Sequence, residues 1–146
     1  MTTTATPYLC VKDCARAIEF YEKAFGAKET MRLNDPKDGR VGHAEIKIGE
    51  ALIMLADEFP DFGVRGPQSI GGSPVTIVLG VPDVDAVATR AVAAGLKVVR
   101  PVEDQFYGER AGRFEDPFGH VWVISTHKED VTVEEMRRRY AELYKR

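Results

Sequence analysis

Hydrophobic and polar positions follow the same order in the two halves of the chain. In the first half an apolar segment at 8–11 precedes an amphipathic segment at 15–25, and the second half repeats this at 76–81 and 85–94. Each half ends in a pattern typical of paired strands. In the first half this is 45–49 followed by 52–55, and in the second half it is 114–120 followed by 121–124. A period near 3.6 indicates a helix and a period of two a strand. We therefore expect one unit built by duplication, with its functional site where the halves meet.

Residues that begin and end helices flank both amphipathic segments. Asp13 and Asp83 are typical N-caps, and Gly26 and Gly95 are typical ends. The buried stripe expected for the first helix is Ala17, Ile18, Phe20, Tyr21, Ala24 and Phe25. The remaining pattern predicts strands at 28–33, 41–48, 51–56, 74–81, 97–101, 108–115 and 121–126.

Two segments are rich in turn residues. Residues 34–39 predict an exposed loop, and 57–73 form a long linker in which glycines and prolines leave little regular structure. We expect Phe59, Phe62, Val64 and Ile70 of this linker to pack over a neighbouring surface. A loop of this length in a small domain is more often functional than idle.

A last helix, beginning at Thr132, has no counterpart in the first half. The segment from Thr132 to Glu135 has the form of a capping box. Its apolar stripe consists of Val133, Met136, Tyr140, Leu143 and Tyr144. This stripe is expected to dock either on the same chain or on a second subunit.

Composition narrows the class of protein. The chain has 146 residues, a hydrophobic content of 44% and a net charge of -3, which fits one globular domain and disfavours nucleic-acid binding. The apolar runs are too short to span a bilayer, and residues 1–6 do not resemble a signal peptide. We therefore predict a cytoplasmic protein with no membrane partner. Cys10 and Cys14 are interpreted as structural thiols, although a helix N-terminus can lower the pKa of a thiol such as Cys14.

Several motifs, in the same order in both halves, resemble the vicinal oxygen chelate superfamily, which includes glyoxalase I, extradiol dioxygenases and the fosfomycin- and bleomycin-resistance proteins. The resemblance covers roughly 7–130 and is nearest to PhnB-like and bleomycin-resistance-like members. The motifs are Val-x-Asp before each helix, as Val11-Lys12-Asp13 and Val81-Pro82-Asp83, then Phe20-Tyr21 in the first helix, Gly108-Glu109-Arg110, Asp116-Pro117-Phe118-Gly119-His120 and Thr126-His127-Lys128-Glu129-Asp130.

The resemblance implies an α+β fold, in which tandem βαβββ modules form open, cup-shaped mixed sheets, with an extra C-terminal helix. In the single domain 1–146 it places module one at about 5–57, the linker at about 58–73, module two at about 74–127 and the C-terminal helix at about 131–145. The fold alone does not indicate an activity, because it hosts many chemistries.

Metal-dependent members of that superfamily take one ligand from each of four strands. The corresponding positions here are Thr6, Met54, Thr76 and Val123. None of the four is a usual ligand for zinc, nickel or iron. The resemblance therefore predicts a protein without a cofactor, whose cavity is lined by these four residues and suits an organic ligand.

Three further groups are candidates for the site. Arg110 is either an anchor for a ligand anion or part of a surface pair with Glu109. Phe59 and Phe62 are expected to give the ligand apolar contacts. His43 and Glu45 share one face of a strand, as a solvent-facing polar pair or as an alternative metal or acid–base pair.

Three functions remain open at this stage. The favoured one is a bleomycin-resistance-like protein that binds a small organic molecule without a metal. The alternative is a lyase, isomerase or dioxygenase that uses His43 and Glu45, or acid–base groups alone. The third is a protein whose role is assembly through the terminal helix. A homodimer is expected, because two open cups leave sheet edges and apolar surface exposed.

Overall fold

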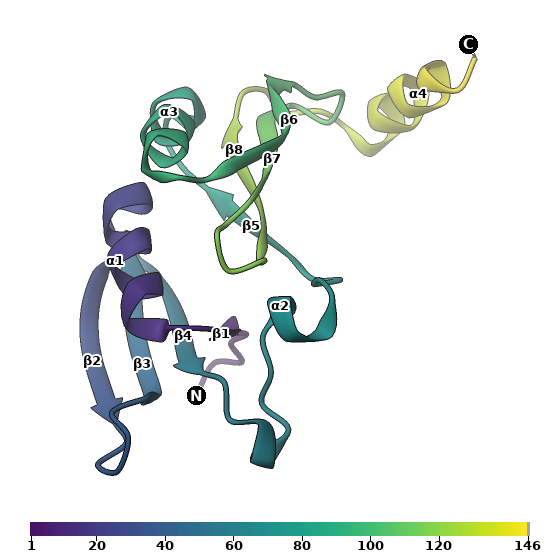
Figure 1. Cartoon of the computed structure of the whole chain (residues 1–146). Helices are drawn as coiled ribbons and strands as arrows, with labels where there is room; N and C mark the ends of the chain where they lie inside the picture. Colours follow the sequence, from purple (N-terminus) through teal and green to yellow (C-terminus); the bar gives the residue numbers. More distant parts are fainter. Residues whose placement is uncertain (146) are drawn as a thin grey trace.

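The computed structural model describes residues 1–145 and contains two βαβββ modules, a connecting segment and a C-terminal helix (Figure 1). The first module consists of β1 (Tyr8–Val11), α1 (Cys14–Phe25), β2 (Lys28–Asn34), β3 (Val41–Ile48) and β4 (Ala51–Asp57). The second consists of β5 (Thr76–Gly80), α3 (Val84–Ala94), β6 (Lys97–Asp104), β7 (Glu109–Glu115) and β8 (Val121–His127). The α+β duplication expected from the sequence is confirmed.

The two sheets have the same topology. Their strand orders are β1-β4-β3-β2 and β5-β8-β7-β6. In each, the first strand pairs in parallel with the last, and the other pairs are antiparallel. A helix covers one face of each sheet, and α1 lies beside α3 (Figure 1). The opposite face of each sheet is left open, and it is this face that positions the candidate site.

The predicted caps form. The Asp13 carboxylate accepts a hydrogen bond from the Arg16 amide at 3.3 Å, and the Asp83 carboxylate accepts one from the Ala86 amide at 3.2 Å. Gly26 ends α1 with a φ of 68°, a conformation that costs glycine little. These local signals begin or end the helices where the sequence predicts.

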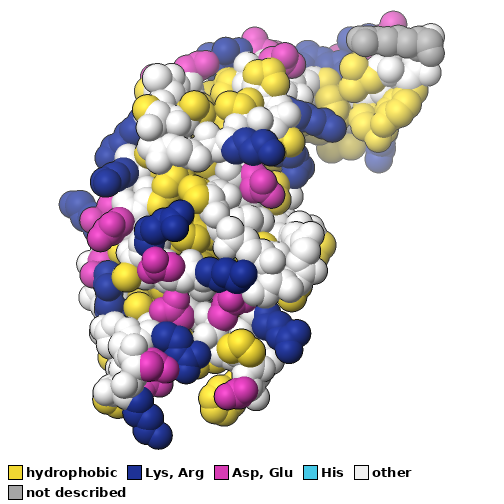
Figure 2. Space-filling view, viewed as in Figure 1, with side chains coloured by type: hydrophobic (Ala, Val, Ile, Leu, Met, Phe, Trp, Pro, Cys, Tyr) yellow, Lys and Arg dark blue, Asp and Glu magenta, His cyan; other side chains and the backbone are white. Residues whose placement is uncertain are grey.

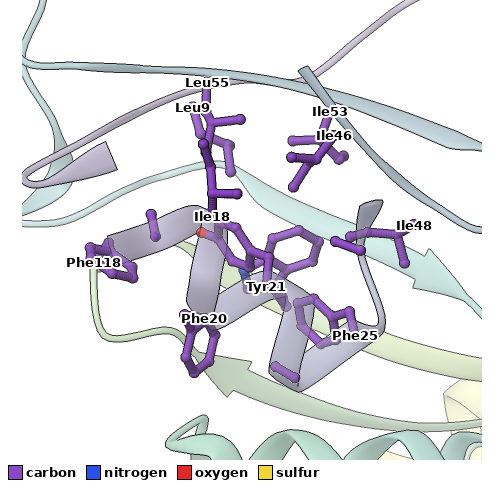
Figure 3. Close-up of a cluster of buried hydrophobic side chains, with 14 of the residues drawn as sticks. Leu9, Ile18, Phe20, Tyr21, Phe25, Ile46, Ile48, Ile53, Leu55 and Phe118 are labelled. Atoms are coloured by element: carbon purple, nitrogen blue, oxygen red, sulfur yellow. The ribbon is translucent and has the colours of Figure 1, made fainter. Parts of the chain in front are cut away.

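The core lies between α1 and the first sheet and continues into the second module. Leu9, Ile46, Ile53 and Leu55 extend from the sheet toward Ile18 and Tyr21 of α1 (Figure 3). Trp122 of β8 is fully buried, and its ring centroid lies 5.0 Å from that of Phe25 in the other module. Trp122 therefore points to the helix side of its sheet.

Two segments differ from the expected boundaries. The strand expected at 97–101 continues to Asp104, because β6 is an edge strand with irregular pairing around Pro101, where a proline is tolerated. The linker contains a short 3-10 helix, η1 (Pro60–Phe62), and the one-turn helix α2 (Pro67–Ile70). In both short helices the proline stands at the start, where its missing amide hydrogen is not needed.

The last helix, α4 (Val133–Leu143), projects from the second module as an arm (Figure 1). The helix is attached to the second module by a guanidinium nitrogen of Arg139, which donates to the Phe106 carbonyl at 3.0 Å and to the Glu129 carboxylate at 2.8 Å. Hydrophobic side chains gather along the arm (Figure 2). The exposed residues among them are Val133, Tyr140, Leu143 and Tyr144. None of the helices in residues 1–145 is both long and apolar enough to cross a membrane.

Candidate functional site

A pocket of about 670 Å³ lies on the open face of the first sheet. Tyr8 and Cys10 of β1, His43 of β3 and Ala56 of β4 form its floor. They share this face because side chains alternate along a strand, and Leu9, Val11, Ala44 and Leu55 point the other way into the core. The alternation that builds the core therefore also sets which side chains reach the pocket.

The linker forms the opposite wall of the pocket. Phe59, Phe62 and Val64 line it, and the Phe59 and Val64 backbones pair as an isolated antiparallel bridge. The Arg40 guanidinium lies 4.1 Å from the Phe59 ring centroid, so a cation–π contact holds that ring. Of the four linker residues expected to pack over a neighbouring surface, Phe59 is half-buried under Arg40, whereas Phe62, Val64 and Ile70 are exposed.

A row of hydrogen bonds begins at the floor of the pocket and ends at Glu45, which does not line the pocket. The Tyr8 hydroxyl lies 2.6 Å from Nδ1 of His43, and Nε2 of His43 lies 2.8 Å from a carboxylate oxygen of Glu45. An ionised carboxylate only accepts, so Nε2 carries the proton and, in the neutral imidazole, Nδ1 accepts from the phenol. Both lone pairs of the Tyr8 oxygen are then left as acceptors. His43 and Glu45 share a face, as predicted, but they lie half-buried on the open face of the sheet.

The electrostatics of this pocket are simple. Within residues 1–145, Asp35 is its one charged lining residue, and no lysine or arginine of that range lines it. Burial, and to a smaller extent Glu58 and Asp57, raises the pKa of the Cys10 thiol to about 11. Burial likewise raises the pKa of Cys14 to about 12, so the lowering that a helix N-terminus can cause does not prevail. Both thiols are neutral near pH 7, which agrees with a structural role.

The four positions that correspond to metal ligands are divided between the two sheets. Thr6 precedes β1, and Met54 of β4 stands opposite both Tyr8 and Glu45 on the open face of the first sheet. Thr76 and Val123 lie on the second sheet, where the Thr76 hydroxyl accepts a hydrogen bond from Arg113 at 3.1 Å. Methionine, valine and threonine do not fit a metal of this kind, and no three His, Cys, Asp or Glu side chains in residues 1–145 group as a metal site.

Arg110 lies away from the pocket. Its guanidinium donates to the Asp85 carboxylate at 2.8 and 3.1 Å and to Asp104 at 3.2 Å. The expected pair with Glu109 does not form, because Glu109 lies 2.6 Å from Nδ1 of His127 instead. Both carboxylates that hold Arg110 would compete with a ligand anion for its guanidinium.

The other two histidines serve structural contacts. Nε2 of His120 lies 2.9 Å from the Cys10 carbonyl oxygen, which joins the second module to β1. His127 bridges Glu109 and Asp130 at 2.6 and 2.8 Å, and these carboxylates raise its pKa. Neither side chain lines the pocket on the first sheet.

Sequence reasoning missed several residues of functional interest. Tyr8 did not stand out because its role depends on His43, which is 35 residues away in the chain. Arg113 had a usable signal: it alternates with Phe114, whose bulk belongs in the core, so Arg113 must face the open side. Arg110 is an even number of residues from Phe114, so the same alternation places its side chain on the helix side of the sheet.

Comparisons with known proteins agree with this fold. Residues 3–124 match the family model described as Glyoxalase/Bleomycin resistance protein/Dioxygenase superfamily. The chain is 44% identical over 135 residues to the uncharacterized protein Mb0911c of Mycobacterium bovis, covering 90% of this chain and 88% of that one.

Two solved structures resemble the chain. The crystal structure of TioX from Micromonospora sp. ML1 has a TM-score of 0.67 and 26% identity, with 86% of this chain and 99% of that one covered. The fosfomycin resistance protein FosX from Mesorhizobium loti has a TM-score of 0.62 and 20% identity, with 92% and 97% covered. At that identity, FosX shows a shared fold alone.

Proposed function

Because the chain belongs to the Glyoxalase/Bleomycin resistance protein/Dioxygenase superfamily, we propose that it binds a small organic molecule in the pocket on the open face of its first sheet. The observation that carries this proposal is the pocket itself, about 670 Å³ in volume, with a floor of strands and a wall of linker aromatics. Its size and apolar lining with a few polar groups are typical of small-molecule sites. Met54 lies next to Tyr8 on the same face and extends the apolar floor.

The polar groups of the pocket indicate which ligands it accepts. With its own proton donated to His43, the Tyr8 oxygen offers acceptors to a ligand hydroxyl or amine. Asp35 is the charged lining residue, so the pocket suits a neutral or cationic ligand better than an anion. This reverses the earlier expectation that an arginine anchors a ligand anion at the main cavity.

An enzyme of the same superfamily is the second candidate, and one observation favours it. In the Tyr8–His43–Glu45 row, Tyr8 can accept a substrate proton while its own proton moves to His43, and Glu45 stabilises the imidazolium. Burial raises the pKa of Tyr8, as does the nearby charge of Glu45, so the phenol stays protonated near pH 7. The step therefore needs His43 to accept the proton in concert. The metal-dependent chemistry of the superfamily is not part of either proposal.

The neutral fluorescent amine N-phenyl-1-naphthylamine tests the binding proposal. We expect saturable fluorescence enhancement with one site per chain. Phe62→Asp should weaken binding by tenfold or more, because Phe62 lines the pocket and burying a phenyl group is worth about 1.5–3 kcal/mol. Phe62 is 83% exposed, so the variant should fold normally.

The matched control is Val92→Asp on α3, which places the same charge at an exposed apolar position outside the pocket. It should bind the probe like the unchanged protein. Equal affinity in Phe62→Asp and the unchanged protein would disprove the proposed site. A ligand that binds His43→Ala normally but is converted only by the unchanged protein would favour the enzyme.

A further inference from the structure

The open face of the second sheet carries a smaller, polar pocket of about 210 Å³. Arg100 of β6 and Arg113 of β7 line it, together with Glu103, Tyr107 and Val123. This pocket shares no lining residue with the larger one on the first sheet. Its ligand can therefore differ from the ligand of the larger pocket.

Two arginines stand directly opposite each other in this pocket. Arg100 and Arg113 are cross-strand partners in the antiparallel pair β6–β7, and side chains at such positions project to the same face. Like charges placed in this way repel each other and destabilise the sheet. Among residues 1–145, no carboxylate lies within 4.0 Å of a nitrogen of either guanidinium. Glu103 lines the same pocket but remains beyond that distance, so two positive charges face one negative charge.

Arg113 is oriented by a neighbouring strand. It is half-buried, and its guanidinium donates to the Thr76 hydroxyl of β5 at 3.1 Å. Its strand partner on the other side is Val123 of β8. Thr76 and Val123 are the two positions of this module where the resemblance places metal ligands. The Arg113 guanidinium thus lies beside the two positions where the resemblance places ligands for a metal cation.

We propose that Arg113, with Arg100 opposite it, forms a binding site for an oxyanion, a carboxylate or phosphate group of a small molecule. The planar guanidinium pairs with such groups through two parallel hydrogen bonds. An anion between the two arginines also removes their mutual repulsion. The two arginines therefore supply positive charge in the part of the second module where the resemblance places a metal, although Thr76 and Val123 at these positions are not usual metal ligands.

Inorganic phosphate and acetate serve as probes, titrated at constant ionic strength against potassium chloride. Binding is followed through the side-chain Nε–H signals of the arginines by nuclear magnetic resonance, and through the melting temperature. We expect saturable shifts for Arg113 and Arg100, and a higher melting temperature with the oxyanion than with chloride. A response to phosphate but not acetate would identify a phosphate site, and the converse a carboxylate site.

Variants separate the site from general salt effects. Arg113→Gln should weaken binding by tenfold or more, whereas Arg113→Lys keeps the charge and should retain part of it. Arg100→Gln should raise the melting temperature in oxyanion-free buffer, because it removes the repulsion, and should reduce the gain from the probe. Arg137→Gln, on the exposed arm, is the matched control.

An equal response in Arg113→Gln, Arg100→Gln and Arg137→Gln would overturn the proposal, as would a lower melting temperature of Arg100→Gln in oxyanion-free buffer. Circular dichroism of each variant confirms that it is folded. The naphthylamine titration of Arg113→Gln should match the unchanged protein, so the two proposals fail or hold independently.

Discussion

At the scale of single residues, a buried carboxylate joins the two modules. Asp116 is 4% exposed and accepts four hydrogen bonds: from the Tyr21 hydroxyl at 2.5 Å, the Trp122 indole at 2.9 Å and the backbone amides of Phe118 and His120. Tyr21 belongs to α1 of the first module, while the other partners belong to the second. A buried charge needs this degree of compensation, because an unpaired one is strongly destabilising.

Tyr21→Phe tests this junction. The change removes one hydrogen bond to a buried carboxylate and leaves the ring, so the free energy of unfolding should fall by about 1.5–3 kcal/mol. Denaturant unfolding measures the loss. Tyr144→Phe on the exposed end of the arm removes the same hydroxyl and should change the stability by less than about 0.5 kcal/mol. If Tyr21→Phe lowered the free energy of unfolding as little as Tyr144→Phe, the Tyr21–Asp116 hydrogen bond would contribute little to stability.

At the scale of elements, the linker shapes the pocket by its close approach to β1. A Cβ atom built on Gly66 would lie 2.7 Å from the Cys10 carbonyl oxygen, a distance that real side chains do not adopt. The Gly66 amide also donates to the Glu58 carboxylate at 2.8 Å. Glycine at this position lets the linker run against the strand and brings Phe59, Phe62 and Val64 over the open face.

Gly66→Ala should therefore displace the linker from β1. We expect it to lower the free energy of unfolding by about 1–3 kcal/mol, as overpacking does, and to weaken naphthylamine binding. Gly80→Ala is the control, since an added Cβ there meets nothing within 4 Å and its φ is not positive. Melting curves and the probe titration of both variants decide the matter. Unchanged naphthylamine binding in Gly66→Ala would show that the pocket does not depend on the contact between the linker and β1.

These elements also show how far the sequence alone reaches. The helices and most strands follow from periodicity and caps, since Asp13, Gly26 and Asp83 act locally. The Tyr8–His43 contact and the path of the linker could not be predicted, because they depend on contacts between residues distant in the chain. Residue type alone favours Arg110 as an anchor for an anion. The alternation of side chains along β7 instead favours Arg113 as the arginine on the open face of the sheet.

At the scale of the whole molecule, the two modules share a buried contact surface. The helices α1 and α3 lie together, and Nε of Arg90 in α3 donates to the Lys23 carbonyl at the end of α1 at 2.8 Å. Together with the Tyr21–Asp116 bond, these contacts support the proposal that 1–146 folds as one domain. The open sheet faces and the stripe on α4 lie outside this surface.

We predict that the chain forms a homodimer that covers part of this apolar surface. Val133 and Leu143 on α4 are 59% and 44% exposed, and a projecting helix with an apolar stripe is stabilised when a second copy covers it. Light scattering should give twice the 16.2 kDa of one chain at micromolar concentration. The double change Val133→Asp and Leu143→Asp should raise the dissociation constant at least about a hundredfold, since each side chain contributes about 1.5–3 kcal/mol when buried.

Arg137→Gln lies on the polar side of the same helix and serves again as the control, with no change in mass expected. The mass of one chain for the unchanged protein would contradict the dimer. A dimer that survives the double change would place the contact elsewhere, and the open sheet faces are the alternative, because exposed Val78 lies on one of them. In that case the two pockets would border the interface, and naphthylamine or phosphate should shift the dimer equilibrium. An interface through α4 predicts no such shift, because neither pocket contains a residue of that helix.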